Sequence, residues 1–294
     1  MSAASTTLRA HQLTVDGRTA FVQDWGPEHG RPLLAIHTAG QSGVQYRDAA
    51  RELAALGYRV LVPDLPGHGH SEPARGGPVT DLADYARFCL KALTLLRIDR
   101  PVVVGCSIGG KIALEIGALA GDGIAAIIAM AANAEAGHVN IRAMRRELTD
   151  ISAPSRSDRT YWGTLAVMGS AVSTRRRELI GRMHCREDPQ VSGSDLLAWG
   201  THDVAERLPR ITAPTHLVVG DDDLWVDAER VGRAAGRIGR SRFTRLPGIG
   251  HYPMEEMDDF ADVIDGWVED LLALGAHTAA GASAPATPPE GENP

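Results

Sequence analysis

The segment Gly105-Cys106-Ser107-Ile108-Gly109-Gly110 follows directly on the apolar run Pro101-Val102-Val103-Val104. That run is typical of a buried strand, and apolar residues recur after it at i, i+4 and i+7 from Ile112, as one face of a helix requires. The pattern G-x-S-x-G therefore lies where a strand turns into a helix. A serine on such a tight turn exposes its hydroxyl to substrate, and the next amide points toward a developing oxyanion. We interpret Ser107 as a nucleophile rather than as a serine that only caps the helix.

An acid and a histidine follow this serine in the order Ser…Asp…His. The apolar run Leu217-Val218-Val219 leads into Gly220-Asp221-Asp222-Asp223, an acidic loop that closes a strand. A further strand-like stretch at 242–246 leads into Gly248-Ile249-Gly250-His251-Tyr252-Pro253. A serine hydroxyl needs a base that takes its proton, and the base needs an acid that holds the imidazole in the correct tautomer. We predict that His251 is the base and that one of the three aspartates is the acid.

Taken together, these features resemble the α/β-hydrolase fold superfamily. Residues 33–37 (LLAIH) resemble the strand that leads into the oxyanion loop of that superfamily, and residues 64–71 (DLPGHGHS) resemble its D-x-x-G-x-G-x-S loop. Residues 254–256 (MEE) follow the histidine as they commonly do there. The resemblance extends from about residue 10 to about residue 275 in register.

The resemblance selects Asp223 as the catalytic acid, because the family pattern at this place is G-x-x-D. The two neighbouring aspartates are then expected to cap the helix that begins near Val226, where the helix dipole favours acids. Some relatives place the acid after the strand that ends near residue 130, where this chain has Glu135. We favour Asp223 over Glu135.

The resemblance also implies an oxyanion hole made of two backbone amides. One donor is the N–H of Ile108, and the other comes from the loop after the 32–37 strand, where Ala39 takes the donor position. Related proteins usually have His-Gly-x here, whereas this chain has His37-Thr38-Ala39. Thr38 therefore replaces the usual glycine and brings a hydroxyl to the site.

Strand and helix patterns alternate along most of the chain, which indicates a twisted, mostly parallel sheet covered by helices on both faces. We predict an α/β fold with an eight-stranded sheet and a core made of residues 8–132 and 212–275. The strand-like segments lie at about 9–14, 19–25, 32–37, 58–63, 100–105, 124–130, 215–220 and 242–246. The helical patterns lie at about 43–56, 80–97, 108–120, 226–238 and 257–274.

Residues 133–211 interrupt the alternation without a strand pattern. Loops of this length without a function are uncommon in compact domains, and the resemblance implies a helical lid here. Residues 133–190 contain ten arginines against seven acidic residues. This excess of positive charge favours either a solvated pair of helices, which we prefer, or a pocket that attracts carboxylates. The tail at 276–294 is rich in small residues and proline, and we expect it to be disordered.

Composition limits the classes of function. The net charge of −7 and the lack of a basic stripe argue against a nucleic-acid partner. Three cysteines without metal-ligand spacing favour neither a disulfide framework nor a metal site, and Cys106 is expected in the core. Residues 1–7 carry no apolar targeting segment, and the longest apolar run, 124–132, is too short to span a membrane. We expect a cytoplasmic protein, monomeric or homodimeric, without membrane attachment.

The resemblance implies a serine hydrolase that cleaves a carboxylic ester, lactone or thioester of a small organic molecule through an acyl-enzyme on Ser107, with no metal or cofactor. One alternative is a C–C bond hydrolase of diketone-type substrates, although such relatives commonly have Trp after the catalytic histidine. The other alternative is a non-hydrolytic member of the fold, such as a lyase, a cyclase or a receptor. The residues expected to line the substrate pocket are Thr38, Trp162, Trp225 and Tyr252.

Overall fold

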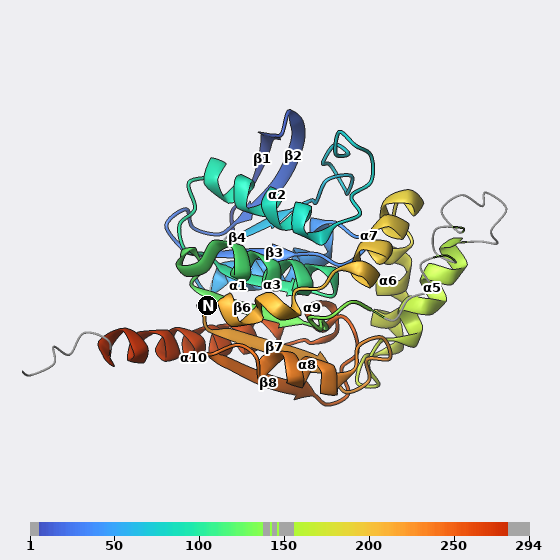
Figure 1. The fold of residues 1–294 in the computed structure, drawn as a ribbon. Coiled ribbons are helices and arrows are strands. Elements are labelled where there is room, and N and C mark those ends of the chain that lie inside the picture. The colour runs from blue at the N-terminus through green and yellow to red at the C-terminus, as the bar shows by residue number, and fades with distance from the viewer. Residues whose placement is uncertain (1–5, 138–141, 143–145, 147–155, 282–294) are drawn as a thin grey trace, which may run out of the picture.

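The computed structural model describes residues 6–137, 142, 146 and 156–281 (Figure 1). These residues form one eight-stranded sheet in the order β1-β2-β4-β3-β5-β6-β7-β8. The strands are β1 (Leu8–Val15), β2 (Arg18–Trp25), β3 (Arg31–Ile36), β4 (Tyr58–Pro63), β5 (Val102–Cys106), β6 (Ala126–Met130), β7 (Thr215–Gly220) and β8 (Ser241–Leu246). Pairing is antiparallel between β1 and β2 and between β2 and β4, and parallel from β4 to β8, which confirms the predicted sheet.

Helices connect and flank these strands. Before the segment at 133–211 the chain forms η1 (Gly43–Tyr46), α1 (Arg47–Ala55), α2 (Leu82–Leu95), α3 (Ile108–Ala120) and η2 (Gly121–Gly123). Within and after that segment it forms α5 (Arg156–Ala166), α6 (Thr174–His184), α7 (Pro189–Thr201), η3 (Ala205–Arg210), α8 (Ala228–Ala235), α9 (Pro253–Glu256) and α10 (Phe260–Gly281). Helix α10 continues past Gly275 into the expected tail, and residues 282–294 of that tail lie outside the described residues.

The order of the strands creates a binding crevice. The chain runs from β3 to β4 in one direction along the sheet and from β4 to β5 in the other. Because crossovers between parallel strands are right-handed, α1 and α2 cover opposite faces of the sheet. On one face α10 contacts α1, and on the other face α3 contacts α2. The reversal makes β3 and β5 neighbours, with Ile36 opposite Gly105. Ligands of open α/β sheets bind beyond the carboxyl ends of the strands at such a point.

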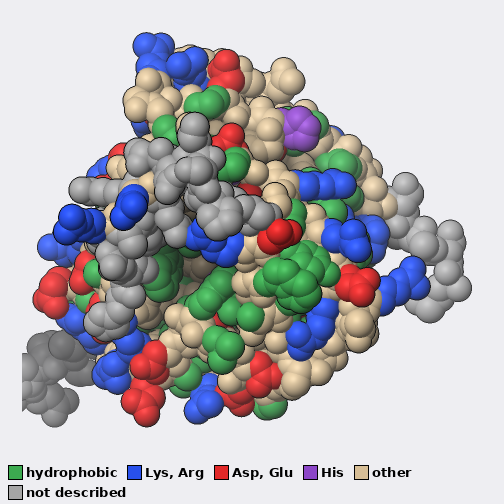
Figure 2. Space-filling view, turned by 90° about the vertical axis from the view of Figure 1, so that its right-hand side faces the viewer, with side chains coloured by type: hydrophobic (Ala, Val, Ile, Leu, Met, Phe, Trp, Pro, Cys, Tyr) green, Lys and Arg blue, Asp and Glu red, His purple; other side chains and the backbone are tan. Residues whose placement is uncertain are grey.

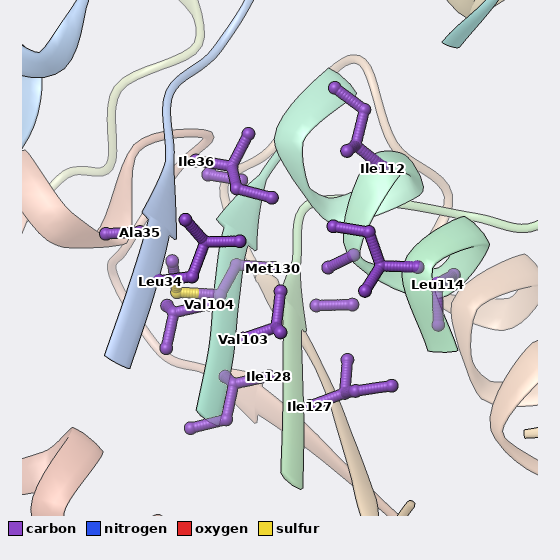
Figure 3. Packing of buried hydrophobic residues seen from close by; sticks show 14 of the residues in the cluster. Leu34, Ala35, Ile36, Val103, Val104, Ile112, Leu114, Ile127, Ile128 and Met130 are labelled. Atoms are coloured by element: carbon purple, nitrogen blue, oxygen red, sulfur yellow. The ribbon is translucent and has the colours of Figure 1, made fainter. Parts of the chain in front are cut away.

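The core around this point is apolar on both faces of the sheet. Val103 and Ile127 lie on the side of β5 and β6 that α3 covers with Ile112, whereas Val104 and Met130 point to the opposite side of the sheet (Figure 3). All five side chains are buried. Strands shielded on both faces need continuous apolar runs, and β5 and β6 have them. The carboxyl end of β5 is thus held in a rigid setting.

The segment between β6 and β7 is helical where the structure describes it. In Figure 1 its helices α5, α6 and α7 lie together at the right-hand end of the sheet. The buried ammonium of Lys111 on α3 donates hydrogen bonds to carbonyl oxygens of Glu135, Trp199 and His202, at 2.7, 3.1 and 3.2 Å. Burial lowers the pKa of Lys111 to about 8. One side chain therefore fastens both ends of this segment to α3.

The close packing of β5 on α3 gives a first test. A Cβ added at Gly105 would overlap the backbone of Gly109, whereas one added at Gly239 would meet no atom. We expect Gly105→Ala to lower the free energy of unfolding by about 1–3 kcal/mol or more, the usual cost of overpacking, and Gly239→Ala to leave it nearly unchanged. Urea unfolding of both variants measures the difference. Equal urea midpoints for the two variants would show that β5 and the start of α3 can move apart without loss of stability.

Candidate active site

The backbone at Ser107 has φ 58° and ψ −118°, a conformation that L residues rarely adopt. Such strain costs about 1–3 kcal/mol and persists only where the surroundings enforce it. Here the Ser107 amide donates to the carbonyl of Met130 at 2.9 Å, and its carbonyl accepts from the amide of Lys111 at 3.1 Å. The Ser107 side chain makes no capping hydrogen bond to α3. The turn therefore presents the hydroxyl at the end of β5 without using it to hold the helix.

His251 and Asp223 form a buried pair. Nδ1 of His251 lies 2.8 Å from Oδ2 of Asp223, and the side chains are 2% and 0% exposed. The other carboxylate oxygen of Asp223 accepts from the amides of Trp225 and Val226 at 2.8 and 3.2 Å, which fixes the carboxylate. A proton on Nδ1 facing the carboxylate leaves Nε2 as the acceptor, the tautomer that a general base requires.

The other candidate acids are engaged elsewhere. Asp221 pairs with Arg245, and Asp222 accepts from the amide and the hydroxyl of Ser170. Neither aspartate caps α8, so that expectation is wrong. The cap of α8 is Asp227, whose carboxylate accepts from the amide two residues on. The carboxylate of Glu135, the alternative acid, lies 3.0 Å from the Arg230 guanidinium. Among these acids, the structure places Asp223 against His251.

The loop that carries His251 is held by the buried carboxylate of Glu256, which belongs to the 254–256 segment of the family resemblance but had no predicted role. Glu256 accepts hydrogen bonds from the amides of Gly250, Tyr252 and Gly169 at 2.6, 2.9 and 2.9 Å. Burial raises the pKa of Glu256, against the effect of these three donors. Because Gly169 follows α5, the same carboxylate joins the histidine loop to the inserted helices. The only signal in the sequence is its place shortly after the histidine.

Cys106 links the serine turn to the histidine loop. Its buried thiol donates to the carbonyl of His251 at 3.1 Å, and burial raises its pKa. The cysteine is a core residue, as expected, and the adjacent Ser107 is thereby brought to the His251 loop. The hydroxyl of Ser107 and Nε2 of His251 have no hydrogen-bond partner among the residues that the structure describes. Both atoms are free to engage each other or a substrate.

Three backbone amides of the loop after β3 donate hydrogen bonds to acceptors within the protein. The amide of Thr38 donates to Oε1 of Gln45 at 2.9 Å, and the amide of Gly40 donates to Oδ2 of Asp195 at 2.8 Å. The amide of Gln41 donates to the carbonyl of Thr38 at 3.2 Å. The loop is thus a fixed turn in which the glycine usual at the Thr38 position is not required.

The two predicted oxyanion donors are the amides left over. No hydrogen bond within the described part of the chain uses the amide of Ala39 or that of Ile108. A Cβ added at Gly109 would overlap the carbonyl oxygen of Ile36, so the start of α3 packs directly against the end of β3. The two free amides therefore belong to adjoining segments beside Ser107, as an oxyanion hole requires.

A buried polar network connects this loop to the inserted helices. The Gln45 side-chain amide donates to the hydroxyl of Thr38 at 3.1 Å and to the carboxylate of Glu255 at 2.9 Å. The same carboxylate lies 2.7 Å from Nε2 of His184 on α6, and Nδ1 of that ring faces the hydroxyl of Thr164. Of the predicted pocket residues, Thr38 is therefore buried with its hydroxyl already bonded.

Two of the other predicted pocket residues lie against His251. The rings of Trp225 and Tyr252 pack edge-on against it, with centroids 4.8 and 5.0 Å away. Tyr252 is buried, whereas Trp225 is 49% exposed and so offers a wall to an incoming ligand. Trp162 on α5 is 65% exposed and packs against Tyr161. Figure 2 shows the face of the molecule that lies at the right-hand side of Figure 1. On this face, exposed hydrophobic side chains lie among many Lys and Arg side chains.

Ser107 does not line either of two cavities that lie beside the inserted helices. One of about 550 Å³ lies between α1 and α6, and one of about 330 Å³ lies between the 40–45 loop, the 67–69 loop and α6. Gln45 and Glu255 line both. Two of the arginines nearby are used internally: Arg176 pairs with Asp258, and Arg177 donates to carbonyls at the end of α5 and beyond. Arg145, another arginine of the 133–190 segment, lies outside the described residues.

No group of three or more His, Cys, Asp or Glu side chains in the described part of the chain is placed to hold a metal ion. Nor does any helix within the described ranges combine the length and the apolar character that a bilayer span needs.

The sequence model of the alpha/beta hydrolase family matches residues 33–263. This range begins in β3, includes Ser107, Asp223 and His251, and ends in α10. The chain therefore belongs to the alpha/beta hydrolase family.

The proteins to which this chain is similar have names that indicate different activities. The chain is 28% identical over 264 residues to the magnesium-chelatase 30 kDa subunit of Rhodobacter capsulatus, covering 85% of this chain and 90% of that protein. It is 26% identical over 238 residues to the non-heme chloroperoxidase CPO-A1 of Kitasatospora aureofaciens, covering 76% and 85%. A malate-bound thermophilic esterase from Thermogutta terrifontis shares the fold, with a TM-score of 0.75, 22% identity, and coverage of 91% and 99%.

The carboxylate that holds the histidine loop gives a second test. Replacing Glu256 by Gln turns one acceptor oxygen into an N–H donor that faces amide donors. A buried donor left without an acceptor costs about 1–3 kcal/mol, and we expect Glu256→Gln to lower the free energy of unfolding by that amount. Glu229→Gln, at an exposed carboxylate of α8, is the control and should change it little. Urea unfolding that gives the same midpoint for both variants would refute the role of Glu256.

Proposed function

We propose that this protein is a serine hydrolase that cleaves a carboxylic ester, lactone or thioester of a small organic molecule through an acyl-enzyme on Ser107. The observation that carries the proposal is the strained turn at Ser107, which lies next to the loop of the buried His251–Asp223 pair. The free amides of Ala39 and Ile108 on the adjoining segments complete the set of groups that acyl transfer needs.

In the proposed first step, Nε2 of His251 takes the proton of the Ser107 hydroxyl while the serine oxygen attacks the acyl carbon. The carbonyl oxygen becomes an oxyanion, which accepts hydrogen bonds from the amides of Ala39 and Ile108. His251 then gives the proton to the leaving alcohol or thiol, whose bond to the acyl carbon breaks. Ser107 is left as an ester of the acyl group.

In the second step, water repeats the attack. His251 takes a proton from the water, whose oxygen adds to the acyl carbon, and the same two amides stabilise the second oxyanion. The bond to the serine oxygen breaks, and His251 returns the proton to Ser107. The carboxylic acid is released. Asp223 stays ionised throughout, holding the imidazole and stabilising its cation.

The comparisons support the reaction class more than the substrate. The fold is shared with a solved esterase, and the family is that of alpha/beta hydrolases. The set of serine, histidine, acid and two free amides favours a hydrolase over a non-hydrolytic member of the fold. The partly exposed indole of Trp225 beside His251 favours an apolar group on the substrate.

Replacement of the serine tests the nucleophile. We expect wild-type protein to hydrolyse p-nitrophenyl esters and to be labelled at Ser107 by a fluorophosphonate. Ser107→Ala should lose labelling and about 10⁶ in kcat, the usual loss for such a nucleophile. Ser241→Ala, on the edge strand β8, serves as the control and should keep both. Substantial turnover by Ser107→Ala would overturn the assignment.

Replacement of the two candidate acids tests the triad. Asp223→Asn should lower kcat by about 10⁴, because the amide stabilises the wrong tautomer of His251. Glu135→Gln should leave kcat close to that of wild type, since Glu135 pairs with Arg230 and not with the imidazole. Steady-state kinetics on one p-nitrophenyl ester gives both values. The reverse order of the two effects would move the acid to the segment after β6.

A further inference from the structure

Asp195 is a buried acid that the proposed reaction does not use. It lies on α7 within the inserted segment, and its side chain is 0% exposed. Its carboxylate accepts from the amide of Gly40 at 2.8 Å and from the hydroxyl of Tyr85 at 2.7 Å, and it lies 2.8 Å from Nε2 of His68. These three partners come from three different segments of the core. A carboxylate so placed fixes the position of all three.

A buried charge persists only when it is paired and hydrogen-bonded. The ring of His68 supplies the counter-charge, since its Nδ1 faces the carbonyl oxygens of Leu65 and Pro66 while its Nε2 faces Asp195. Both ring nitrogens can donate only in the protonated ring. Burial lowers the pKa of His68, but the charge and hydrogen bond of Asp195 outweigh it and the pKa is raised. Paired with the protonated ring, the carboxylate adds little net negative charge beside an oxyanion.

Gly40 is the point at which α7 touches the loop after β3. Its φ of 69° favours glycine, and a Cβ added there would meet Ser192 of α7. Its amide is directed into the Asp195 carboxylate, and the amide of Thr38 is held by Gln45. The free amide of Ala39 lies between these two anchored ones. Its direction is therefore set from one side by the core and from the other by α7.

We propose that Asp195 is a positioning residue for the oxyanion hole, which it aligns by holding the Gly40 amide. The inserted helices then complete the catalytic site as well as covering it. The inference rests on the proposed function, because it assigns Asp195 to the donor that the hydrolytic step uses. It concerns the amide of Ala39 alone, since Ile108 is positioned by the turn at Ser107.

The test is the kinetics of Asp195→Ala against a matched control on the same helix. Loss of an oxyanion donor typically lowers kcat by about 10²–10³, and a displaced donor retains part of that effect. We therefore expect Asp195→Ala to lower kcat on a p-nitrophenyl ester by at least about tenfold, with KM nearly unchanged. Asp188→Ala removes the N-cap of α7 without touching the loop. It should lower the melting temperature and keep kcat.

A transition-state analogue gives a readout that helix stability alone does not move. The Ser107 oxygen adds to the carbonyl carbon of an aryl trifluoromethyl ketone. The carbonyl oxygen of the ketone becomes the oxyanion, and the serine proton passes to His251. Its inhibition constant should rise with Asp195→Ala in proportion to the loss of kcat, and should not change with Asp188→Ala. Equal kcat and equal inhibition constants for Asp195→Ala and wild type would overturn the inference while leaving the hydrolase intact.

Two further results separate the remaining outcomes. If Asp195→Ala does not fold, amide hydrogen exchange of the wild-type 38–43 segment decides: slow exchange of Gly40 supports the anchor, and exchange as fast as in an open loop overturns it. If wild-type protein neither cleaves esters nor takes up a fluorophosphonate, the proposed function fails and the inference fails with it. Activity of the wild type combined with an indifferent Asp195→Ala variant refutes the inference alone.

Discussion

The positive φ of Ser107 is the constraint on which the rest of the site depends. A non-glycine residue adopts this conformation only if its surroundings make every alternative worse. Here β5 pairs with β3 and β6 on either side, and glycines let α3 approach the backbone of both β3 and β5. The core thereby enforces the strain, and in this conformation the hydroxyl makes no capping hydrogen bond to α3 and the amide of Ile108 has no acceptor among the described residues. The packing of the sheet and of α3 thereby fixes the backbone on which the Ser107 hydroxyl is carried.

Buried carboxylates connect the inserted helices to this core. Glu256 binds amides of the histidine loop and of the segment after α5, while Glu255 joins His184 of α6 to Gln45 behind the loop after β3. Asp195 of α7 binds that loop directly. Removing any one partner would leave a buried charge or donor unsatisfied, which costs far more than an exposed pair. The inserted helices are in this sense part of the framework that holds the candidate site.

Much of this was predictable from local sequence. Continuous apolar runs marked the buried strands, and the glycines around Ser107 marked the turn, because both depend on residues adjacent in the chain. The contacts of Asp195 were not predictable in this way, because its partner Gly40 is 155 positions away in the chain and no spacing rule connects the two residues. The roles of Asp221 and Asp222 were mistaken for the same reason: their partners lie on β8 and after α5, and the dipole of α8 competes poorly with a charged or doubly hydrogen-bonded partner.

In the proposed reaction, Ser107, His251 and the amides of Ala39 and Ile108 act on one acyl group. The most direct measurement is a crystal structure of the protein with a small alkyl or aryl boronic acid. We expect a covalent bond from the serine oxygen to boron, with one boronate oxygen within hydrogen-bond distance of both amides and another near Nε2 of His251. Boron bonded elsewhere, or a boronate oxygen that faces neither amide, would contradict it.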